Sequence, residues 1–129
     1  MFTNNTKEIQ EKLVKGLLEI IVLQMLNSQP MHGYQIITKI RRSFGVYFGP
    51  STIYPLLASL EKQKYVKSSW DMSGERPKKV YMLTNEGKVL LDSAEDSLGL
   101  ICKKIGNTNV SEILLTARLG ISRNTALNL

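Results

Sequence analysis

The stretch from Gly49 to Thr84 constrains the fold of this chain more than any other part of the sequence. Within residues 50–61, apolar side chains recur three or four positions apart, at Ile53, Leu56, Leu57 and Leu60. This spacing predicts a helix with one buried face. Beyond Lys64 the pattern changes to alternation, which predicts two short strands joined by a turn. We therefore expect a helix that is followed directly by a β-hairpin.

The face of this helix that is predicted to be exposed is small and rich in hydroxyl groups: it carries Ser51, Thr52, Tyr54 and Ser59. A helix that faces only water more often carries Glu and Lys, whereas short hydroxyl side chains can approach phosphates and base edges closely. We expect the helix to start near Ser51, with Gly49 or Ser51 as its cap, because this keeps Pro55 close to the first turn. The segment is a candidate DNA-recognition helix.

The predicted hairpin has a basic tip. In its first strand Val66 and Trp70 share a face, and residues 80–83 form the return strand. Gly74 and Pro77 supply the turn. Three basic side chains flank this turn and are only partly offset by Glu75: Arg76, Lys78 and Lys79. A basic hairpin beside a hydroxyl-rich helix fits a wing that reaches a phosphate backbone or a minor groove.

The formal net charge of +6 is concentrated in one part of the chain. Residues 31–88 hold ten basic and four acidic side chains, whereas residues 1–30 and residues 89–129 are each balanced. The basic excess thus coincides with the predicted helix and hairpin, as expected for contact with nucleic acid, although a solvated basic surface explains the charge equally well. Further candidates for phosphate contacts are Lys15, Lys39 and Arg42, with Lys12 and Arg41 beside them.

Length and composition limit the other possibilities. A chain of 129 residues is long enough to bury a core without a disulfide or a metal, and Cys102 is the single cysteine. The first residues lack the basic-then-apolar pattern of a signal peptide, and the sequence shows no apolar run long enough to cross a bilayer, no Gly-rich phosphate loop and no nucleophile paired with a base. We expect a cytoplasmic protein that is not an enzyme, is not bound to a membrane, and needs neither a metal nor a cofactor.

Two further helices are expected upstream. Asn5 and Glu8 match a capping box, and apolar residues then keep helical spacing up to about Asn27, with Gly16 as a point where the helix can bend or restart. The next helix is predicted over residues 32–44 and closes at a glycine. Together with the recognition helix these segments form a helix-turn-helix core, and the hairpin makes it a winged one.

A last long helix is predicted after Thr84, which can cap it within the motif Leu83-Thr84-Asn85-Glu86-Gly87. Its apolar residues follow heptad spacing: Leu91, Ala94, Leu98, Ile101 and Ile105. Because three helices already fill the core of a winged helix, we expect this stripe to pack against a second copy, and an ordinary core-facing stripe is the alternative. We divide the chain into a DNA-binding domain, residues 1–84, and a dimerisation helix with a tail, residues 85–129.

Several single residues have two interpretations. We expect Tyr34 in the core, Tyr54 facing DNA, and Trp70 packed under the hairpin rather than in an effector pocket. His32, the only histidine, is expected at a helix start, since one histidine without other ligands makes no metal site. Cys102 lies beside the dimer stripe and is a candidate redox sensor, but we favour a buried hydrophobic role for it.

Motifs in a specific order extend from about Lys12 to Ile105. They are Lys15-Gly16-Leu17-Leu18-Glu19, Met31-His32-Gly33-Tyr34, Thr52-Ile53-Tyr54-Pro55-Leu56-Leu57 with Leu60-Glu61, Pro77-Lys78-Lys79-Val80-Tyr81 and Leu83-Thr84-Asn85-Glu86-Gly87. This combination resembles the PadR family of winged-helix transcriptional regulators, in particular its members with a short C-terminal region. The resemblance implies a mostly α-helical fold with a small β-hairpin and a C-terminal dimerisation helix. It also implies a homodimer that binds an inverted-repeat operator, usually as a repressor, and that in some members releases DNA in response to a small molecule or a stress signal.

Two features depart from the family pattern. The wing of the family commonly carries Arg after its Pro, whereas this chain has Lys78 there and Arg76 on the other side of the Pro, which leaves open which of the two enters the groove. The tail is the second departure. Residues 106–109 break the helix, residues 110–117 suggest a short amphipathic helix, and residues 119–125 resemble the turn of a second helix-turn-helix. We expect the tail to add a dimer contact or to be disordered.

The patterns favour sequence-specific binding of double-stranded DNA by a homodimer, with two recognition helices in successive major grooves and the wings flanking them. The alternative is a winged-helix module that binds an acidic protein partner through the same basic face. The small polar face of the helix favours DNA, because a protein partner would favour an exposed apolar face.

Overall fold

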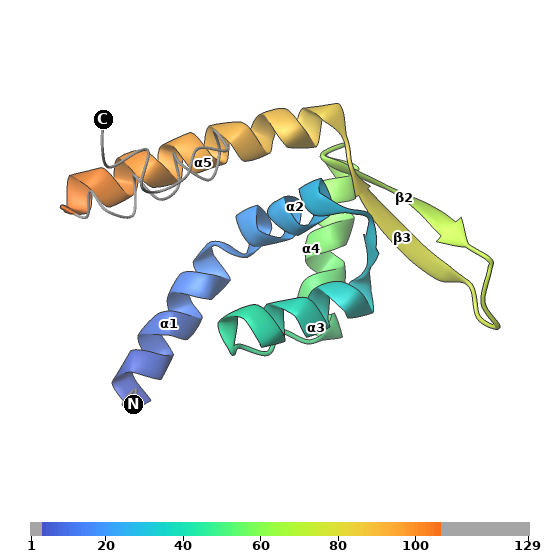
Figure 1. Ribbon diagram of the computed structural model, residues 1–129, viewed down its shortest axis with the longest axis horizontal. Coiled ribbons are helices and arrows are strands. Elements are labelled where there is room, and N and C mark those ends of the chain that lie inside the picture. Colours follow the sequence, from blue (N-terminus) through green and yellow to red (C-terminus); the bar gives the residue numbers. More distant parts are fainter. Residues whose placement is uncertain (1–3, 107–129) are drawn as a thin grey trace, which may run out of the picture. The chain divides into compact units, whose positions relative to one another are not determined.

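The computed structural model describes residues 4–106 and is mostly α-helical with a small antiparallel sheet (Figure 1). The chain forms two compact units that divide between Leu90 and Leu91, and each unit is described by itself. The first unit includes the start of the last helix, whereas the domain division that we predict from the sequence precedes that helix.

The N-terminal helical region consists of two helices, α1 (Asn4–Gly16) and α2 (Leu18–Ser28). The break falls at Gly16, because glycine loses more conformational freedom in a helix than any other residue, and the predicted restart is confirmed. The predicted cap at Asn5 is wrong. The helix is already formed at Asn4, so that Asn5 lies inside its first turn, where its side chain cannot serve as the cap.

The second predicted helix is α3 (Gly33–Phe44), and His32 is its N-terminal cap residue as expected. The backbone N–H of His32 donates a hydrogen bond to Oε1 of Gln35 over 3.1 Å, which satisfies one donor at the helix start. The helix ends at Gly45, whose φ of 70° lies in the left-handed region that glycine adopts without strain.

Tyr34 does not belong to the core, contrary to the prediction. Its side chain is 73% exposed, and the buried face of α3 consists of Ile36, Ile37 and Ile40. Tyr34 and Ile37 are three residues apart, so the sequence allows both on one buried stripe. The stripe that is buried instead starts at Ile36. It contains only aliphatic side chains, so no phenol hydroxyl needs a hydrogen-bond partner in the core. Tyr34 therefore lies beside the buried face rather than within it.

The predicted helix and hairpin are α4 (Pro50–Lys62), β2 (Val66–Asp71) and β3 (Lys78–Leu83). A third strand, β1 (Met31–His32), was not predicted; it pairs with β3, and the sheet order is β1-β3-β2 with both pairs antiparallel. A strand of two residues has no periodicity that a sequence pattern can detect. The third strand extends the sheet from the wing to the start of α3.

The hydrophobic core of the first unit lies where α2, α3 and α4 meet the base of the sheet. Its fully buried residues are Val22, Leu23, Ile36, Ile40, Ile53, Leu57, Leu60 and Val66. Each such side chain stabilises the fold by about 1.5–3 kcal/mol relative to an exposed one. The β2–β3 hairpin projects away from this core (Figure 1), so that its outer part has no layer packed on it.

The last helix, α5 (Asn85–Ile105), is capped by Thr84 as predicted. Oγ1 of Thr84 accepts a hydrogen bond from the N–H of Gly87 over 3.0 Å and lies 2.7 Å from the carbonyl oxygen of Lys64, to which it donates. Gly87 is required by close packing, because a Cβ there would lie 2.1 Å from the carbonyl oxygen of Tyr65. The first turn of α5 is thereby attached to the chain that enters β2.

The second unit is described up to Gly106 and contains the remainder of α5. Its predicted apolar stripe changes from buried to exposed along the helix: Leu91 is buried, Ala94 and Leu98 are half-buried, and Ile101 and Ile105 are 54% and 79% exposed. The C-terminal part of the stripe therefore presents apolar surface to solvent within a single chain.

Cys102 is a free, half-buried thiol. The predictions for the tail beyond Gly106, a short amphipathic helix and a second helix-turn-helix turn, lie outside the described residues. Within residues 4–106 no helix combines the length and the apolar character that crossing a membrane requires.

Candidate nucleic-acid interface

The recognition helix α4 begins at Pro50, with Gly49 as its N-terminal cap residue, slightly before the predicted start. Proline suits the first position because its φ is preset and its missing N–H has no partner there anyway. Pro55 consequently lies beyond the first turn, where it removes the N–H that would bond to the carbonyl of Ser51. The helix nevertheless continues to Lys62. The packing of its buried face outweighs the lost hydrogen bond.

The two predicted faces of α4 are confirmed. The core face carries Ile53, Leu57 and Leu60, which are buried, and Leu56, which is half-buried. The outer face carries exposed Ser51, Tyr54, Pro55, Ala58 and Ser59, together with half-buried Thr52. Charged side chains occur only near the C-terminal end of the helix. Most of the outer face is therefore uncharged, and its three short hydroxyl side chains permit close approach to another molecule.

Tyr54 also has a packing role. A Cβ at Gly33 would lie 2.6 Å from the ring atoms Cε1 and Cζ of Tyr54 and 2.7 Å from its hydroxyl oxygen. The ring therefore lies directly on the backbone at the start of α3, and a side chain at position 33 would have to displace it. The side chain remains 42% exposed. Packing of one ring face thus fixes the direction of a tyrosine that still reaches the surface.

The wing is formed by β2 and β3, but its basic residues are not all in the turn. β3 starts earlier than expected, so that Lys78 and Lys79 lie in the strand, and Arg76 lies in the connecting loop. Asp71 accepts hydrogen bonds from Oγ of Ser73 over 2.6 Å and from its N–H over 3.0 Å. These two hydrogen bonds, the side-chain one first, lower the pKa of Asp71 below its ordinary value of 3.8. The loop is therefore closed by an ionised carboxylate.

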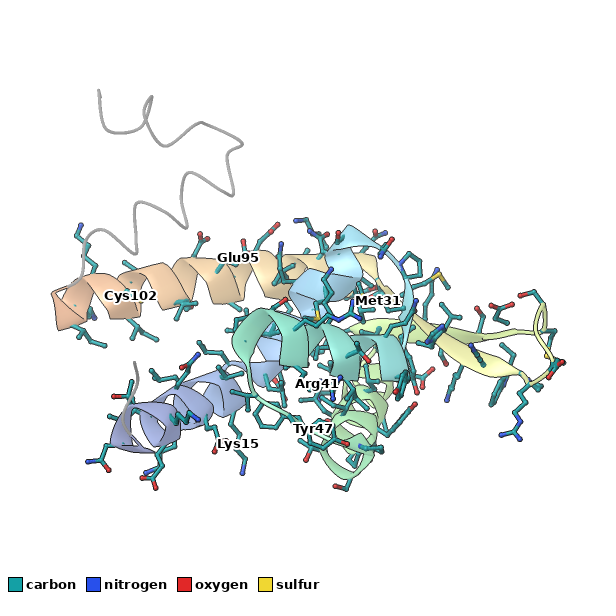
Figure 2. All side chains as sticks on the ribbon, turned by 60° about the horizontal axis from the view of Figure 1, so that its bottom comes forward. Lys15, Met31, Arg41, Tyr47, Glu95 and Cys102 are labelled. Atoms are coloured by element: carbon teal, nitrogen blue, oxygen red, sulfur yellow. The ribbon has the colours of Figure 1, made fainter. Side chains whose placement is uncertain are left out.

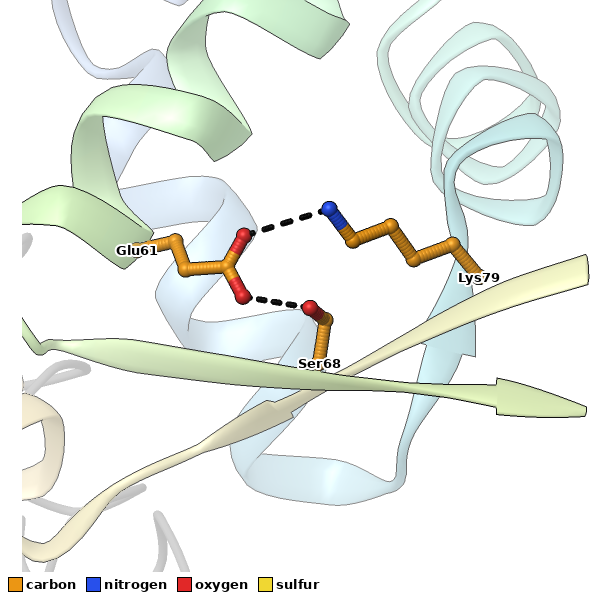
Figure 3. Close-up of polar contacts among 3 residues, drawn as sticks. All are labelled: Glu61, Ser68 and Lys79. Carbon is orange, nitrogen blue, oxygen red and sulfur yellow. Dashed lines mark hydrogen bonds and ion pairs between the residues drawn. The ribbon is translucent and has the colours of Figure 1, made fainter.

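Lys79 has partners within the protein. Its Nζ lies 3.4 Å from Oε1 of Glu61 on α4 and 5.7 Å from the centroid of the Tyr81 ring. The other carboxylate oxygen of Glu61 accepts a hydrogen bond from Oγ of Ser68 on β2 (Figure 3). Burial raises the pKa of Tyr81 above its ordinary value of 10.0, and the nearby Lys79 opposes this shift. One carboxylate thus connects the recognition helix with both strands of the wing.

Trp70 does not pack under the hairpin, which corrects the prediction. It is 63% exposed and opposes Lys79 across the two strands, while Ser68 opposes Tyr81. Opposed residues of an antiparallel pair lie on the same face of the sheet. Trp70 therefore lies on the face of the wing that meets Glu61, further toward the tip. Alternation predicted this face correctly, but the projecting hairpin leaves the outer part of the face uncovered.

The other predicted phosphate contacts come from two helices. Lys39 and Arg42 are exposed on α3 and border a groove of about 480 Å³ that Tyr34 also lines. Lys15 is exposed near the end of α1, where Figure 2 labels it, and α1 lies away from the hairpin in Figure 1. The two α3 residues thus line one groove, and Lys15 is not among its lining residues.

Exposed aromatic residues were missed by the sequence reasoning. Tyr47 lies in the connector between α3 and α4 and lines a groove of about 170 Å³ together with Tyr34, Arg41 and Pro50; Arg41 and Tyr47 are labelled in Figure 2. The available signal was an aromatic residue in a short connector just before a helix start. In the described part of the chain, no three His, Cys, Asp or Glu side chains gather as a metal site.

Comparison with known proteins places these features in a family. Residues 22–93 match the family described as "Transcriptional regulator PadR-like family". The crystal structure of a PadR family transcriptional regulator from Eggerthella lenta has a TM-score of 0.71 at 31% identity, and the match covers 78% of this chain and 88% of that chain. The structure of Bacillus subtilis PadR in complex with operator DNA has a TM-score of 0.56 at 26% identity, over 60% of this chain and 45% of that one.

A curated relative from Streptomyces fradiae, the "Uncharacterized 37.1 kDa protein in transposon TN4556", is 29% identical over 94 residues, which are 73% of this chain and 26% of the relative. The chain thus spans about a quarter of that protein's length. The region that matches the family, residues 22–93, makes up more than half of the chain and contains α3, α4 and both strands of the wing. This chain therefore belongs to the PadR-like family of transcriptional regulators.

Proposed function

We propose that this chain is a homodimeric repressor that binds double-stranded DNA at an inverted-repeat operator. The observation that carries the proposal is the connection between α4 and the wing, in which Glu61 contacts Ser68 and Lys79. The hydroxyl-rich face of α4 and the hairpin act as one surface, which fits a helix in the major groove and a wing on the adjacent backbone or minor groove. The complex of Bacillus subtilis PadR with operator DNA supports this proposal.

The residues of this surface divide into two groups by chemistry. Hydroxyl groups both donate and accept hydrogen bonds, so we assign the contacts with bases and nearby phosphates to Ser51, Thr52, Tyr54 and Ser59. Cationic side chains neutralise phosphates and release counterions, so we assign contacts with the backbone to Arg76, Lys78, Lys79, Lys39, Arg42 and Lys15. The first group sets the sequence preference, and the second supplies affinity that depends on salt.

Dimerisation is assigned to the stripe on α5. Two of its residues, Ile101 and Ile105, are largely exposed in a single chain, and heptad spacing allows a second α5 to cover them. Such a dimer has twofold symmetry, and an inverted repeat has the same symmetry, with half-sites about 34–36 Å apart when they are one turn of DNA apart.

Repression is the mode of regulation that we assign, because a dimer seated on an operator excludes other proteins from the same DNA. Release follows if a small molecule or a stress signal favours a state in which the two α4 helices no longer match the half-sites. Such a signal shifts the equilibrium only by the difference between its affinities for the two states.

The proposal is tested by fluorescence anisotropy with the purified protein, the DNA upstream of its own coding region, and an unrelated duplex of equal length. Titrations at about 50 and 200 mM salt should show tighter binding to the upstream duplex and a steep loss of affinity at the higher salt. Equal, salt-sensitive binding to both duplexes would reject this operator. Binding to neither duplex, with capture of an acidic protein instead, would reject DNA binding in favour of a protein-interaction module.

A further inference from the structure

Glu61 occupies a special position in the surface described above. It lies near the C-terminal end of α4, half-buried, and both oxygens of its carboxylate are engaged. Oε1 pairs with Nζ of Lys79 over 3.4 Å, and Oε2 accepts from Ser68 (Figure 3). Its partners come from the two different strands of the wing. The carboxylate is therefore a junction between the helix and the hairpin rather than a solvated surface charge.

The three basic residues beside the turn of the wing are consequently not equivalent; they are Arg76, Lys78 and Lys79. Lys79 is half-buried, paired with Glu61 and placed over the ring of Tyr81. Lys78 is exposed on the other face and opposes Asp71 across the strands. Hydrogen bonds from Ser73 are the main cause of the lowered pKa of Asp71, and the charge of Lys78 contributes less, without an ion pair within 4 Å in the described hairpin. Arg76 is exposed in the loop. Of these three cations, Arg76 and Lys78 are thus available to a phosphate, whereas Lys79 is already paired with a carboxylate.

A carboxylate and a phosphate compete for the same ammonium group. A lysine that stays paired with a carboxylate neutralises no phosphate and releases no counterion from DNA, so it adds nothing to the salt dependence of binding. Its charge becomes fully available when the carboxylate loses its own. The Glu61–Lys79 pair can therefore limit how strongly the wing binds DNA of any sequence.

We propose that Glu61 is a positioning residue that withholds Lys79 from the DNA backbone while it holds the wing against the recognition helix. This inference rests on the proposed DNA-binding function and refines it, since it removes Lys79 from the set of phosphate contacts. Glu61 thereby lowers the affinity of the wing for DNA of any sequence. Discrimination between DNA sequences then depends on the hydroxyl face of α4. Loss of its charge transfers Lys79 to a phosphate.

The test measures the slope of log affinity against log salt for an unrelated duplex. The variants are Glu61→Gln, Lys79→Gln and the double variant, with Glu75→Gln and Lys78→Gln as matched controls. Gln at position 61 keeps an oxygen that accepts from Ser68 but removes the charge. Glu75 lies in the same wing and is exposed, so that its variant changes net charge equally without releasing a lysine.

We expect Lys78→Gln to make the slope shallower by about 0.9 per protomer, and Lys79→Gln to leave it unchanged. Glu61→Gln should make the slope steeper by about 0.9 per protomer, so that lowering the salt from about 200 to 50 mM raises the affinity of the variant about three- to fourfold more per protomer, and roughly tenfold more per dimer, than that of the unaltered protein. This gain should be absent from Glu75→Gln and should vanish in the double variant, because it acts through Lys79.

Three outcomes would overturn the inference. If Lys79→Gln makes the slope as shallow as Lys78→Gln does, Lys79 reaches a phosphate while Glu61 is present. If the effect of Glu61→Gln equals that of Glu75→Gln and persists without Lys79, the carboxylate acts only by general repulsion. If the unaltered protein binds no duplex at any salt concentration, the proposed function fails and this inference fails with it. The first two outcomes leave the proposed function intact.

Discussion

At the scale of single residues, Gly87 has the least room for a side chain among the glycines that the structure describes. A Cβ there would meet the carbonyl oxygen of Tyr65 at 2.1 Å and Cδ1 of Leu83 at 2.7 Å. Backbone atoms cannot rotate away as side chains do, so Gly87→Ala has to displace the start of α5. We expect it to lower the free energy of unfolding by about 1–3 kcal/mol or more, as measured by urea denaturation.

Gly99→Ala in the same helix is the matched control for this prediction. A Cβ at Gly99 meets no atom within 4 Å, so that alanine should raise the free energy of unfolding by up to about 1 kcal/mol through helix propensity. Equal effects of the two substitutions would show that the contact with Tyr65 does not constrain the helix start.

The Asp71 carboxyl gives a prediction on pH. Hydrogen bonds from Ser73 lower its pKa below 3.8. These hydrogen bonds to the ionised carboxylate therefore stabilise the wing loop fully at pH values above 3.8. That contribution is lost as the pH falls from 3.8 through the lowered pKa. Ser73→Ala should return the pKa of Asp71 toward 3.8, which carbon-detected NMR titration of the carboxyl group measures. Ser69→Ala, two residues before Asp71 on β2, should leave the pKa unchanged; a pKa that also stays low in Ser73→Ala would contradict the assignment.

Trp70 is the only tryptophan of the chain, and its fluorescence reports on the wing. Because Trp70 is exposed on the face that meets α4, a duplex bound to α4 and the wing should shield it. We expect saturating DNA to reduce quenching by acrylamide, a neutral quencher that the charge of DNA does not repel. High salt, which releases the duplex, should restore the quenching. Unchanged quenching with bound DNA would place the duplex away from this face.

At the scale of secondary-structure elements, α4 contains an internal weakness. Pro55 removes one hydrogen bond from the helix interior, and its side chain is exposed. Pro55→Ala should therefore raise the free energy of unfolding by about 1–3 kcal/mol in thermal or urea denaturation. Ser59→Ala, on the same exposed face, should change it by less than about 0.5 kcal/mol. A less stable Pro55→Ala protein would mean that packing of the proline ring contributes more than the hydrogen bond it costs.

At the scale of the whole molecule, the exposed apolar part of the α5 stripe leads us to predict that two chains form a dimer through it. Leu98→Asp combined with Ile101→Asp places two charges in the proposed contact, where burial without partners is unfavourable. We expect monomers in analytical ultracentrifugation and a loss of operator binding of a hundredfold or more, since two linked half-sites bind far more tightly than one.

Leu100→Asp is the control for the dimer prediction. Leu100 is exposed on α5 as well, but it lies on the side of the helix opposite the heptad stripe. Its variant should remain dimeric and bind DNA as before. A double variant of Leu98 and Ile101 that is still dimeric would show that the stripe is not the dimer contact.

Much of the fold and part of the candidate site were predictable from the sequence by itself. The buried face of α4, the break at Gly16, the end of α3 at Gly45 and the cap at Thr84 all follow from residues within a few positions of one another. Periodicity, glycine conformation and capping hydrogen bonds are local effects, so short segments determine them. The hydroxyl face of α4 followed directly, because the opposite face was already assigned to the core.

The tertiary structure alone decided the remainder. Met31 pairs with Tyr81 in the sheet, and Glu61 pairs with Lys79, although each pair is far apart in the sequence. Whether Trp70 is covered depends on how far the hairpin extends beyond the core. These outcomes are set by which distant segments meet, and a local pattern does not carry that information. Hence the sequence identified the basic residues of the wing, and only the folded chain distinguished the lysine that is paired from those that are available.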